Sequence, residues 1–307
     1  MSNNTEVLKR EGAYSYIALG SFDGIHQGHL TLVDKIIELS KTNYGESIVY
    51  TFLNHPRNLI NKNDSLKLLL DNDTKVNILK ERGVDNVYFE EFNEEFMKYS
   101  PEEFIKYLCN KFNIKGIVVG FNYRFGYKNI GDISLLEKLS KKYDYELYVM
   151  EPCTYKSEVI SSTRIRNELL LGNVEEALHM LTRPYSITGE VIHGKKNGRL
   201  MGFPTANVKY SKMFILPKIG VYYTNVEWNN KIYKGITSVG KNPTFEGENI
   251  TLETYILDFD QEIYGDEITV YFIKKIRDEK KFSSMEELKE QLDKDKKYAE
   301  IETIFMK

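Results

Sequence analysis

The hydrophobic and polar positions follow one pattern in the first part of the chain and another in the second. Between residues 14 and 183, apolar runs of strand length alternate with segments in which apolar residues recur at helical spacing. Such alternation is typical of a parallel sheet covered by helices, which binds ligands at the carboxyl ends of its strands. The strand-like runs lie at residues 16–19, 47–52, 86–89, 116–120 and 146–151, and the helical segments at 30–39, 66–82, 101–112, 135–143 and 161–181.

From residue 185 onward the chain consists of short runs rich in Tyr, Val, Ile and Thr that are separated by glycines. No long helical period returns before Ser284. This pattern predicts a small β-barrel followed by a terminal helix. A chain of 307 residues is long enough for two cores at about 100 to 200 residues each. We therefore predict an α/β domain over residues 1–183 and a barrel domain over residues 184–307.

The composition narrows the classes of partner. The chain is 41% hydrophobic and 28% charged, with a formal net charge of -3, which is typical of a soluble globular protein and gives no basic surface for a nucleic-acid groove. It contains two cysteines, no apolar leader and no run near the roughly 18 apolar residues of a membrane span. We expect a cytoplasmic protein with small-molecule substrates and with no nucleic-acid or membrane partner.

The segment at residues 16–29, Y-I-A-L-G-S-F-D-G-I-H-Q-G-H, joins a strand to a helix through a glycine-rich turn. His26 and His29 stand at the predicted helix start, where free N–H groups and the helix dipole favour anions, and Gly28 lets the backbone approach a phosphate closely. The pattern H-x-G-H resembles the signature of nucleotidylyltransferases, which join a nucleotide α-phosphate to an acceptor and release pyrophosphate. A turn with incidental histidines is the alternative. A zinc site is less favoured because no cysteine is close in sequence.

Three further polar clusters follow predicted strands, at residues 51–56, 120–126 and 160–166. In the last, hydroxyl side chains open a helix while Arg164 and Arg166 supply forked donors suited to phosphate. Helix capping alone would also explain the hydroxyls, but an H-x-G-H motif in the same domain favours a phosphate site.

The second half contains G-F-P-T-A-N at residues 202–207. Thr205 and Asn207 present oxygen ligands two residues apart, which suits a Mg²⁺ ion that takes its other ligands from water and nucleotide phosphates. The segment at residues 235–242 is close to a P-loop, but Asn242 replaces the required Ser or Thr. We interpret this segment as a strand and turn.

Together these segments resemble the bifunctional bacterial FAD synthetases, in which a riboflavin kinase is joined to an FMN adenylyltransferase. The resemblance implies an N-terminal nucleotidylyltransferase domain of Rossmann-like fold and a C-terminal riboflavin kinase barrel. It also implies phosphorylation of riboflavin by ATP with Mg²⁺, followed by adenylylation of the FMN to FAD with release of pyrophosphate. The matching segments are G-S-F-D-G-I-H-Q-G-H, G-F-N-Y-R-F-G, I-S-S-T-R-I-R, R-P-Y-S-I-T-G-E-V-I-H-G, G-F-P-T-A-N, N-P-T-F, T-L-E-T-Y-I-L-D-F and I-Y-G.

The resemblance assigns roles to individual residues. Glu253 matches the family's catalytic carboxylate, which accepts the proton of the ribityl 5′-hydroxyl as that oxygen attacks the γ-phosphate of ATP. The strand pattern alone fits an outward-facing surface residue at position 253 as well as it fits a catalytic one. His26 and His29 are expected to stabilise charge at the α-phosphate while the FMN phosphate attacks. The residues predicted to bind nucleotide and phosphate are Gly20, Phe22, Asp23, Gly28, Asn122, Ser161, Ser162, Thr163, Arg164, Arg166, Gly202 and Pro204, and the predicted metal ligands are Thr205 and Asn207.

Two alternatives remain open at this point. One is a monofunctional homologue in which one domain is retained only to bind flavin or nucleotide. The other is a flavin-sensing module, which lacks support because no added effector segment is present.

The family often has T-F-x-P-H-P where this chain has Asn54 before His55 and Pro56. The roles of Asn54 and His55 are therefore left open.

Overall fold

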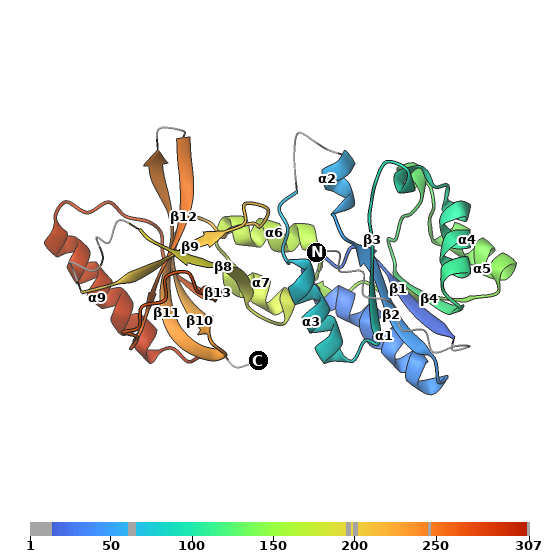
Figure 1. Ribbon diagram of the computed structural model, residues 1–307, viewed down its shortest axis with the longest axis horizontal. Coiled ribbons are helices and arrows are strands. Elements are labelled where there is room, and N and C mark those ends of the chain that lie inside the picture. Colours follow the sequence, from blue (N-terminus) through green and yellow to red (C-terminus); the bar gives the residue numbers. More distant parts are fainter. Residues whose placement is uncertain (1–13, 61–65, 195–197, 199–201, 245–246, 306–307) are drawn as a thin grey trace. The chain divides into compact units, whose positions relative to one another are not determined.

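The computed structural model describes residues 14–60, 66–194, 198, 202–244 and 247–305 (Figure 1). The chain divides into two compact units, Met1–Ser161 and Ser162–Lys307. The predicted architecture is confirmed: a parallel sheet with helices comes first, and an antiparallel barrel with a terminal helix follows.

The described residues of the first unit form a five-stranded parallel sheet in the order β3-β2-β1-β4-β5. The order reverses at β1, whose neighbours are β2 and β4, so the switch point lies at the carboxyl end of β1. The strands are β1 (Ser15–Leu19), β2 (Glu46–Phe52), β3 (Asn86–Glu90), β4 (Ile114–Gly120) and β5 (Glu146–Met150). The helices are α1 (Gln27–Thr42), α2 (Pro56–Ile60), α3 (Asn72–Arg82), α4 (Pro101–Lys111) and α5 (Ile133–Tyr143), with short 3₁₀ turns η1 (Phe96–Lys98) and η2 (Tyr127–Asn129).

Both faces of the sheet are buried, because successive residues of a strand point to opposite sides. On one face, Ala18 and Val49 pack with the apolar stripes of α1 and α3. On the other face, Ile17 and Ile48 pack with α4 and α5 (Figure 1). This arrangement explains why β1 is buried at every position.

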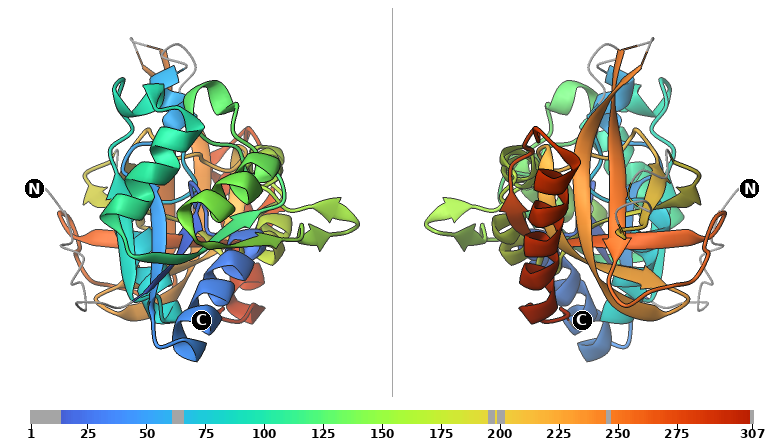
Figure 2. Two further views of the ribbon diagram at one scale, coloured as in Figure 1. Left: turned by 90° about the vertical axis from the view of Figure 1, so that its right-hand side faces the viewer. Right: turned by 90° about the vertical axis from the view of Figure 1, so that its left-hand side faces the viewer.

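Capping residues set where the helices of this unit begin. Ser100 and Glu103 form a capping box at the start of α4, with Pro101 in its first turn. The Asp71 carboxylate accepts the Thr74 N–H at 2.7 Å, so α3 begins at Asn72 and not at residue 66 as the apolar spacing predicted. A short hairpin of β6 (Thr154–Tyr155) and β7 (Glu158–Val159), which the pattern did not predict, projects after β5 (Figure 2).

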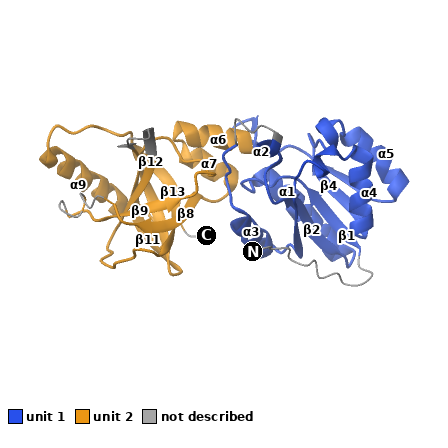
Figure 3. Cartoon of the chain, turned by 45° about the horizontal axis from the view of Figure 1, so that its top comes forward, with its two compact units in different colours: residues 1–161 blue, residues 162–307 orange. Residues whose placement is uncertain are grey.

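The second unit begins with α6 (Ser162–Leu171) and α7 (Val174–Leu181), and α7 packs on strands β8 and β13 (Figure 3). These contacts place both helices in the same compact unit as the barrel. The predicted boundary between the two domains, after residue 183, stays a prediction. Six described strands close the barrel in the order β10-β11-β12-β9-β8-β13. They are β8 (Tyr185–Ile192), β9 (Thr205–Tyr210), β10 (Gly220–Trp228), β11 (Lys231–Thr244), β12 (Gly247–Ile256) and β13 (Glu267–Arg277). The P-loop-like segment lies in β11, so it is a strand as interpreted.

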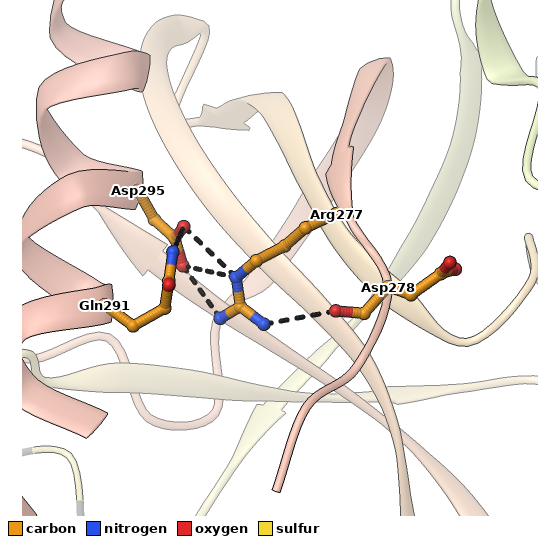
Figure 4. A network of polar contacts seen from close by, with 4 residues as sticks. All are labelled: Arg277, Asp278, Gln291 and Asp295. Atoms are coloured by element: carbon orange, nitrogen blue, oxygen red, sulfur yellow. Dashed lines mark hydrogen bonds and ion pairs between the residues drawn. The ribbon is translucent and has the colours of Figure 1, made fainter. Parts of the chain in front are cut away.

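A buried ion pair joins the terminal helix α9 (Met285–Ile301) to the end of β13 (Figure 4). The Arg277 Nη2 and Nε atoms donate to the Asp295 carboxylate at 2.8 and 3.0 Å, and Gln291 donates to the same carboxylate at 2.9 Å. Asp295 is 2% exposed, so this charged contact is largely shielded from water.

Candidate active sites

The first candidate site begins at a turn between β1 and α1. Phe22, Gly24 and Ile25 have φ values of 47°, 84° and 39°, in the left-handed region. The side chains of Phe22 and Ile25 are fully buried in the core under α1, which holds the turn in this conformation. The turn leads from the sheet edge directly to His26 at the start of α1.

His26 and His29 lie against each other at the amino end of α1. Their imidazole rings are stacked, with centroids 3.7 Å apart and planes 16° apart. The His26 carbonyl accepts the N–H groups of His29 and Leu30 at 2.7 and 3.0 Å, which begins the helix. Two imidazoles, the positive end of a 16-residue helix and the switch point of the sheet thus coincide, which makes this edge suited to an anionic ligand.

Gly28 lies close to the His26 ring. A Cβ atom at this position would lie 3.3 Å from both Nδ1 and Cε1 of His26 and 4.0 Å from Cβ of Cys153. Gly20 is similar, because a Cβ there would lie 3.2 Å from the Phe22 ring. A side chain at either position would therefore press on a neighbouring ring.

Two other predicted residues of the first unit differ in exposure: Asp23 is buried and Asn122 is exposed. Asp23 is 3% exposed and its carboxylate accepts the Leu69 N–H at 3.0 Å, so it anchors the turn to the segment before α3. Asn122 is exposed just past the carboxyl end of β4, the strand next to β1. Their direct contact with nucleotide stays a prediction.

The loop after β2 has a structural role that the sequence left open. The Asn54 side chain donates to the Phe92 carbonyl at 2.8 Å and accepts the Phe92 N–H at 2.9 Å. His55 Nδ1 accepts the Arg57 N–H at 3.3 Å. The two Asn54 hydrogen bonds join the loops that follow β2 and β3, so this amide is used within the protein.

The I-S-S-T-R-I-R segment spans the two units. Ser161 is the last residue of the first unit, and Ser162 begins α6 in the second. Thr163 is exposed, Arg164 is half-buried and Arg166 is buried, with 7% of its surface accessible. The hydroxyls lie at a helix start as expected, while their grouping with the histidines stays a prediction.

The second candidate site lies on the barrel, where Glu253 of β12 is paired with Asn207 of β9. Thr205 is paired with Tyr255 in the same ladder. Directly opposite residues of antiparallel strands point to the same side, with Cβ atoms about 4.5 to 5.5 Å apart. Thr205, Asn207 and Glu253 therefore share one face of the sheet, and all three are half-buried.

The alternate residues of β12 take the opposite face. Leu252, Thr254 and Ile256 are buried. The Thr254 hydroxyl accepts from Thr237, whose hydroxyl lies 2.8 Å from that of Thr224, so a chain of hydroxyls runs between strands inside the barrel. Glu253 accordingly lies on the other face of β12, the face that carries both predicted metal ligands.

The residues on this face fit a Mg²⁺ ion. A Cβ at Gly194 would lie 2.2 Å from Nδ2 and 2.8 Å from Oδ1 of Asn207, so the backbone packs directly against this amide and fixes it. The Thr205 hydroxyl and the Asn207 amide are oxygen donors of the kind Mg²⁺ prefers, with phosphates and waters completing the shell, and the Glu253 carboxylate lies beside them on the same face. The described residues contain no group of three or more His, Cys, Asp or Glu side chains that would form a cage made by protein alone.

The remaining predicted residues of this motif shape its backbone. Gly202 has φ 83°, which explains the glycine. Phe203 donates its N–H to the Gly198 carbonyl at 2.9 Å, and its ring packs on Tyr255 with centroids 5.3 Å apart. Pro204 follows at the surface, immediately before β9. Phe203 thus packs against β12, the strand that carries Glu253.

Comparison with known proteins finds a different family model for each part of the chain. The family model for FAD synthetase matches residues 8–164, and the family model for riboflavin kinase matches residues 181–302. A bifunctional riboflavin kinase/FMN adenylyltransferase of Buchnera aphidicola subsp. Schizaphis graminum is 37% identical, with 94% of both chains covered. The chain belongs to the family of bifunctional riboflavin kinase/FMN adenylyltransferases. Both catalytic domains are present, so a monofunctional homologue is not favoured.

Further proteins are similar to this chain over nearly its whole length. The Bacillus subtilis (strain 168) protein of the same name is 36% identical, with 95% of this chain and 94% of the relative covered. A solved structure from Streptococcus pneumoniae, titled a macrolide-efflux protein, has a TM-score of 0.88 and 34% identity, with 95% of each chain covered. Within the described part of this chain, no helix is long and apolar enough to cross a membrane.

Proposed function

We propose that the chain phosphorylates riboflavin to FMN at its barrel and adenylylates FMN to FAD at the sheet of its first unit. The observation that carries this proposal is the presence of two separate sets of groups. A stacked histidine pair lies at a helix start in one unit, and a carboxylate faces two hard oxygen ligands in the other. Riboflavin, FMN and ATP are the substrates, and Mg²⁺ is the required ion.

In the adenylylation step, a phosphate oxygen of FMN attacks the α-phosphorus of ATP. The new P–O bond forms as the bond from the α-phosphorus to the bridging oxygen of the β-phosphate breaks, and pyrophosphate leaves. His26 and His29 stabilise the negative charge that develops at the α-phosphate, aided by the amino end of α1. Gly28 leaves room for the phosphate beside His26. No covalent nucleophile is needed.

The departing pyrophosphate is held by the cluster that starts α6. Arg164 and Arg166 are always charged and present forked donors, while Ser161, Ser162 and Thr163 supply hydroxyls. Asn122, beyond the end of β4, contacts the nucleotide, and Gly20, Phe22 and Asp23 shape the turn beneath it. This part of the proposal is supported by the family match, which covers these residues except Arg166, and by the position of Asn122 after β4 and of Ser162 at the start of α6.

In the kinase step, Glu253 accepts the proton of the ribityl 5′-hydroxyl as that oxygen attacks the γ-phosphorus of ATP, and ADP leaves. Thr205 and Asn207 hold Mg²⁺, which when bound neutralises charge on the phosphates. Gly202 and Pro204 bring the backbone close to the nucleotide. Pairing of Glu253 with Asn207 supports this role, because the two residues lie side by side on one face of the barrel.

The enzyme acts in the cytoplasm, where ATP is abundant. Cys109 and Cys153 are both free thiols, in keeping with a reducing compartment.

Separation of flavins after two incubations tests the proposal. Purified protein is given ATP and Mg²⁺ with riboflavin in one tube and with FMN in the other. We expect FAD in both. FMN as the sole product from riboflavin, with no FAD from FMN, would restrict activity to the barrel, and no product in either tube would refute both assignments.

A further inference from the structure

The turn between β1 and α1 is strained, and its geometry determines where His26 lies. Three of its residues, Phe22, Gly24 and Ile25, have positive φ values. This conformation is unfavourable for side chains other than glycine, and most of all for a β-branched residue such as isoleucine. Strain of about 1 to 3 kcal/mol per residue persists only where the surroundings impose it. The contacts that hold this turn are therefore part of the site.

Two polar side chains from neighbouring elements hold the Ser21 carbonyl at the entry to the turn. The Thr51 hydroxyl of β2 donates to this carbonyl at 2.9 Å, and the Lys75 ammonium of α3 donates to it at 3.2 Å. Thr51 is fully buried and Lys75 is 5% exposed. Both donors fix the peptide immediately before Phe22, the first left-handed residue.

The burial of Lys75 is costly, which argues for a role other than packing. Its ammonium lies 5.7 Å from the centroid of the Phe89 ring. Burial lowers the pKa of Lys75 to about 8, although the charges of Asp23 and Asp71 act in the opposite direction. A lowered pKa means that the fold disfavours the charged form of this lysine. The chain nevertheless places the ammonium on the one carbonyl that leads into the turn.

We propose that Lys75 is a positioning residue of the adenylylation site, which acts with Thr51 through the Ser21 carbonyl to hold the turn that carries His26 and His29. The inference rests on the proposed adenylyl transfer in the first unit. Lys75 acts through the backbone and does not touch the reacting groups. Misplacement of reacting groups by about 1 Å lowers a rate on the order of a hundredfold, so a small movement of the turn is sufficient.

Lys75→Met, Thr51→Val and the double variant test this role, with Lys80→Met as a matched control. Lys80 lies on the same helix and also donates to a backbone carbonyl, that of Asp85. We expect the kcat of FAD formation from FMN to fall about a hundredfold in Lys75→Met with little change in KM. Thr51→Val lowers kcat in the same direction. The double variant loses less than the product of the single losses, because both donors act on one carbonyl.

Two readouts separate positioning from a merely structural role. Riboflavin phosphorylation at the barrel stays at the wild-type rate in every variant, and Lys80→Met keeps both activities. The chain has five histidines, so their Cε1–H resonances can be followed one by one. Movement of the turn changes the mutual ring-current shifts of His26 and His29 and leaves the other three unchanged.

The proposal would be overturned if Lys75→Met showed unchanged histidine resonances and formed FAD as fast as Lys80→Met does. If Lys75→Met does not fold, the same two measurements on Thr51→Val test the proposal, because this variant removes a donor to the same carbonyl without changing charge. Wild-type protein that forms no FAD from FMN would instead contradict the proposed function, so the two failures are distinguishable.

Discussion

The imidazole rings of His26 and His29 are stacked, with centroids 3.7 Å apart and 16° between their planes. The two side chains therefore act as one surface at the amino end of α1. Gly28 lies between them in sequence, and a Cβ atom there would lie 3.3 Å from the His26 ring. A side chain at position 28 would therefore press on one ring of the pair.

Gly28→Ala is expected to lower FAD formation from FMN without unfolding the protein. The added methyl group would be in tighter than ordinary contact with His26, so the ring must shift by a few tenths of an ångström from its present position against His29. Steady-state rates of adenylylation and of riboflavin phosphorylation are compared in the same preparation. Equal loss of both activities would contradict a local effect.

Gly194→Ala is expected to raise the Mg²⁺ concentration needed for half-maximal riboflavin phosphorylation. Its Cβ would lie 2.2 Å from the Asn207 amide, which must then leave its position opposite Glu253. Excess Mg²⁺ should restore part of the rate, since the ligand is displaced and not removed. A Mg²⁺ titration checks this, and an unchanged titration curve would exclude Asn207 as a ligand.

The lowered pKa of Lys75 predicts that the free energy of unfolding depends on pH. Its pKa is about 8 in the folded protein against 10.5 for the free side chain, so between these values the unfolded chain binds more protons. Stability from this group therefore rises as pH increases from 8 to 10.5, by about 3 kcal/mol at most. Hydrogen exchange of β1 and β2 amides should show wild type gaining stability relative to Lys75→Met over this window. A constant difference between the two proteins would argue against the buried charge.

Asp295→Ala is expected to destabilise the barrel by about 3 kcal/mol, because it leaves Arg277 without its buried carboxylate. Trp228 is the single tryptophan of the chain and lies in β10, so its fluorescence reports unfolding of this unit. Glu300→Ala is the matched control: its pair with Lys296 lies on the same helix but is solvent-exposed, and its loss should cost less than about 1 kcal/mol. Similar effects of the two changes would contradict a stabilising role for the buried pair.

The periodicity of the sequence was sufficient for the architecture, because strands buried on both faces and alternating barrel strands leave different patterns. It was insufficient for the start of α3, where the Asp71 cap prevailed over an apolar run that began at Leu66. The fixed spacing of H-x-G-H indicated the histidine pair, since three residues at a helix start bring two side chains together. Glu253 could be assigned only by resemblance, because its pairing with Asn207 joins residues far apart in sequence.

Lys75 and Asn54 were beyond the reach of motif analysis. A lysine in a helix is ordinarily exposed. The role proposed for Lys75 depends on its hydrogen bond to the Ser21 carbonyl, at the start of the turn Ser21–Ile25. One signal was available, because Lys75 lies four residues before the buried Leu79 and so shares its helix face. Asn54 binds both polar groups of the Phe92 backbone, a contact across two loops that no local pattern encodes.

The most direct test of two independent sites is a comparison of flavin products from Glu253→Gln and His29→Ala, each incubated with ATP and Mg²⁺ and either riboflavin or FMN. Removal of a general base lowers a rate by about 10² to 10⁴. We predict that Glu253→Gln forms FAD from FMN at the wild-type rate but almost none from riboflavin. His29→Ala should accumulate FMN from riboflavin and form little FAD from either flavin. Loss of both activities in either variant, with the protein still folded, would contradict the account.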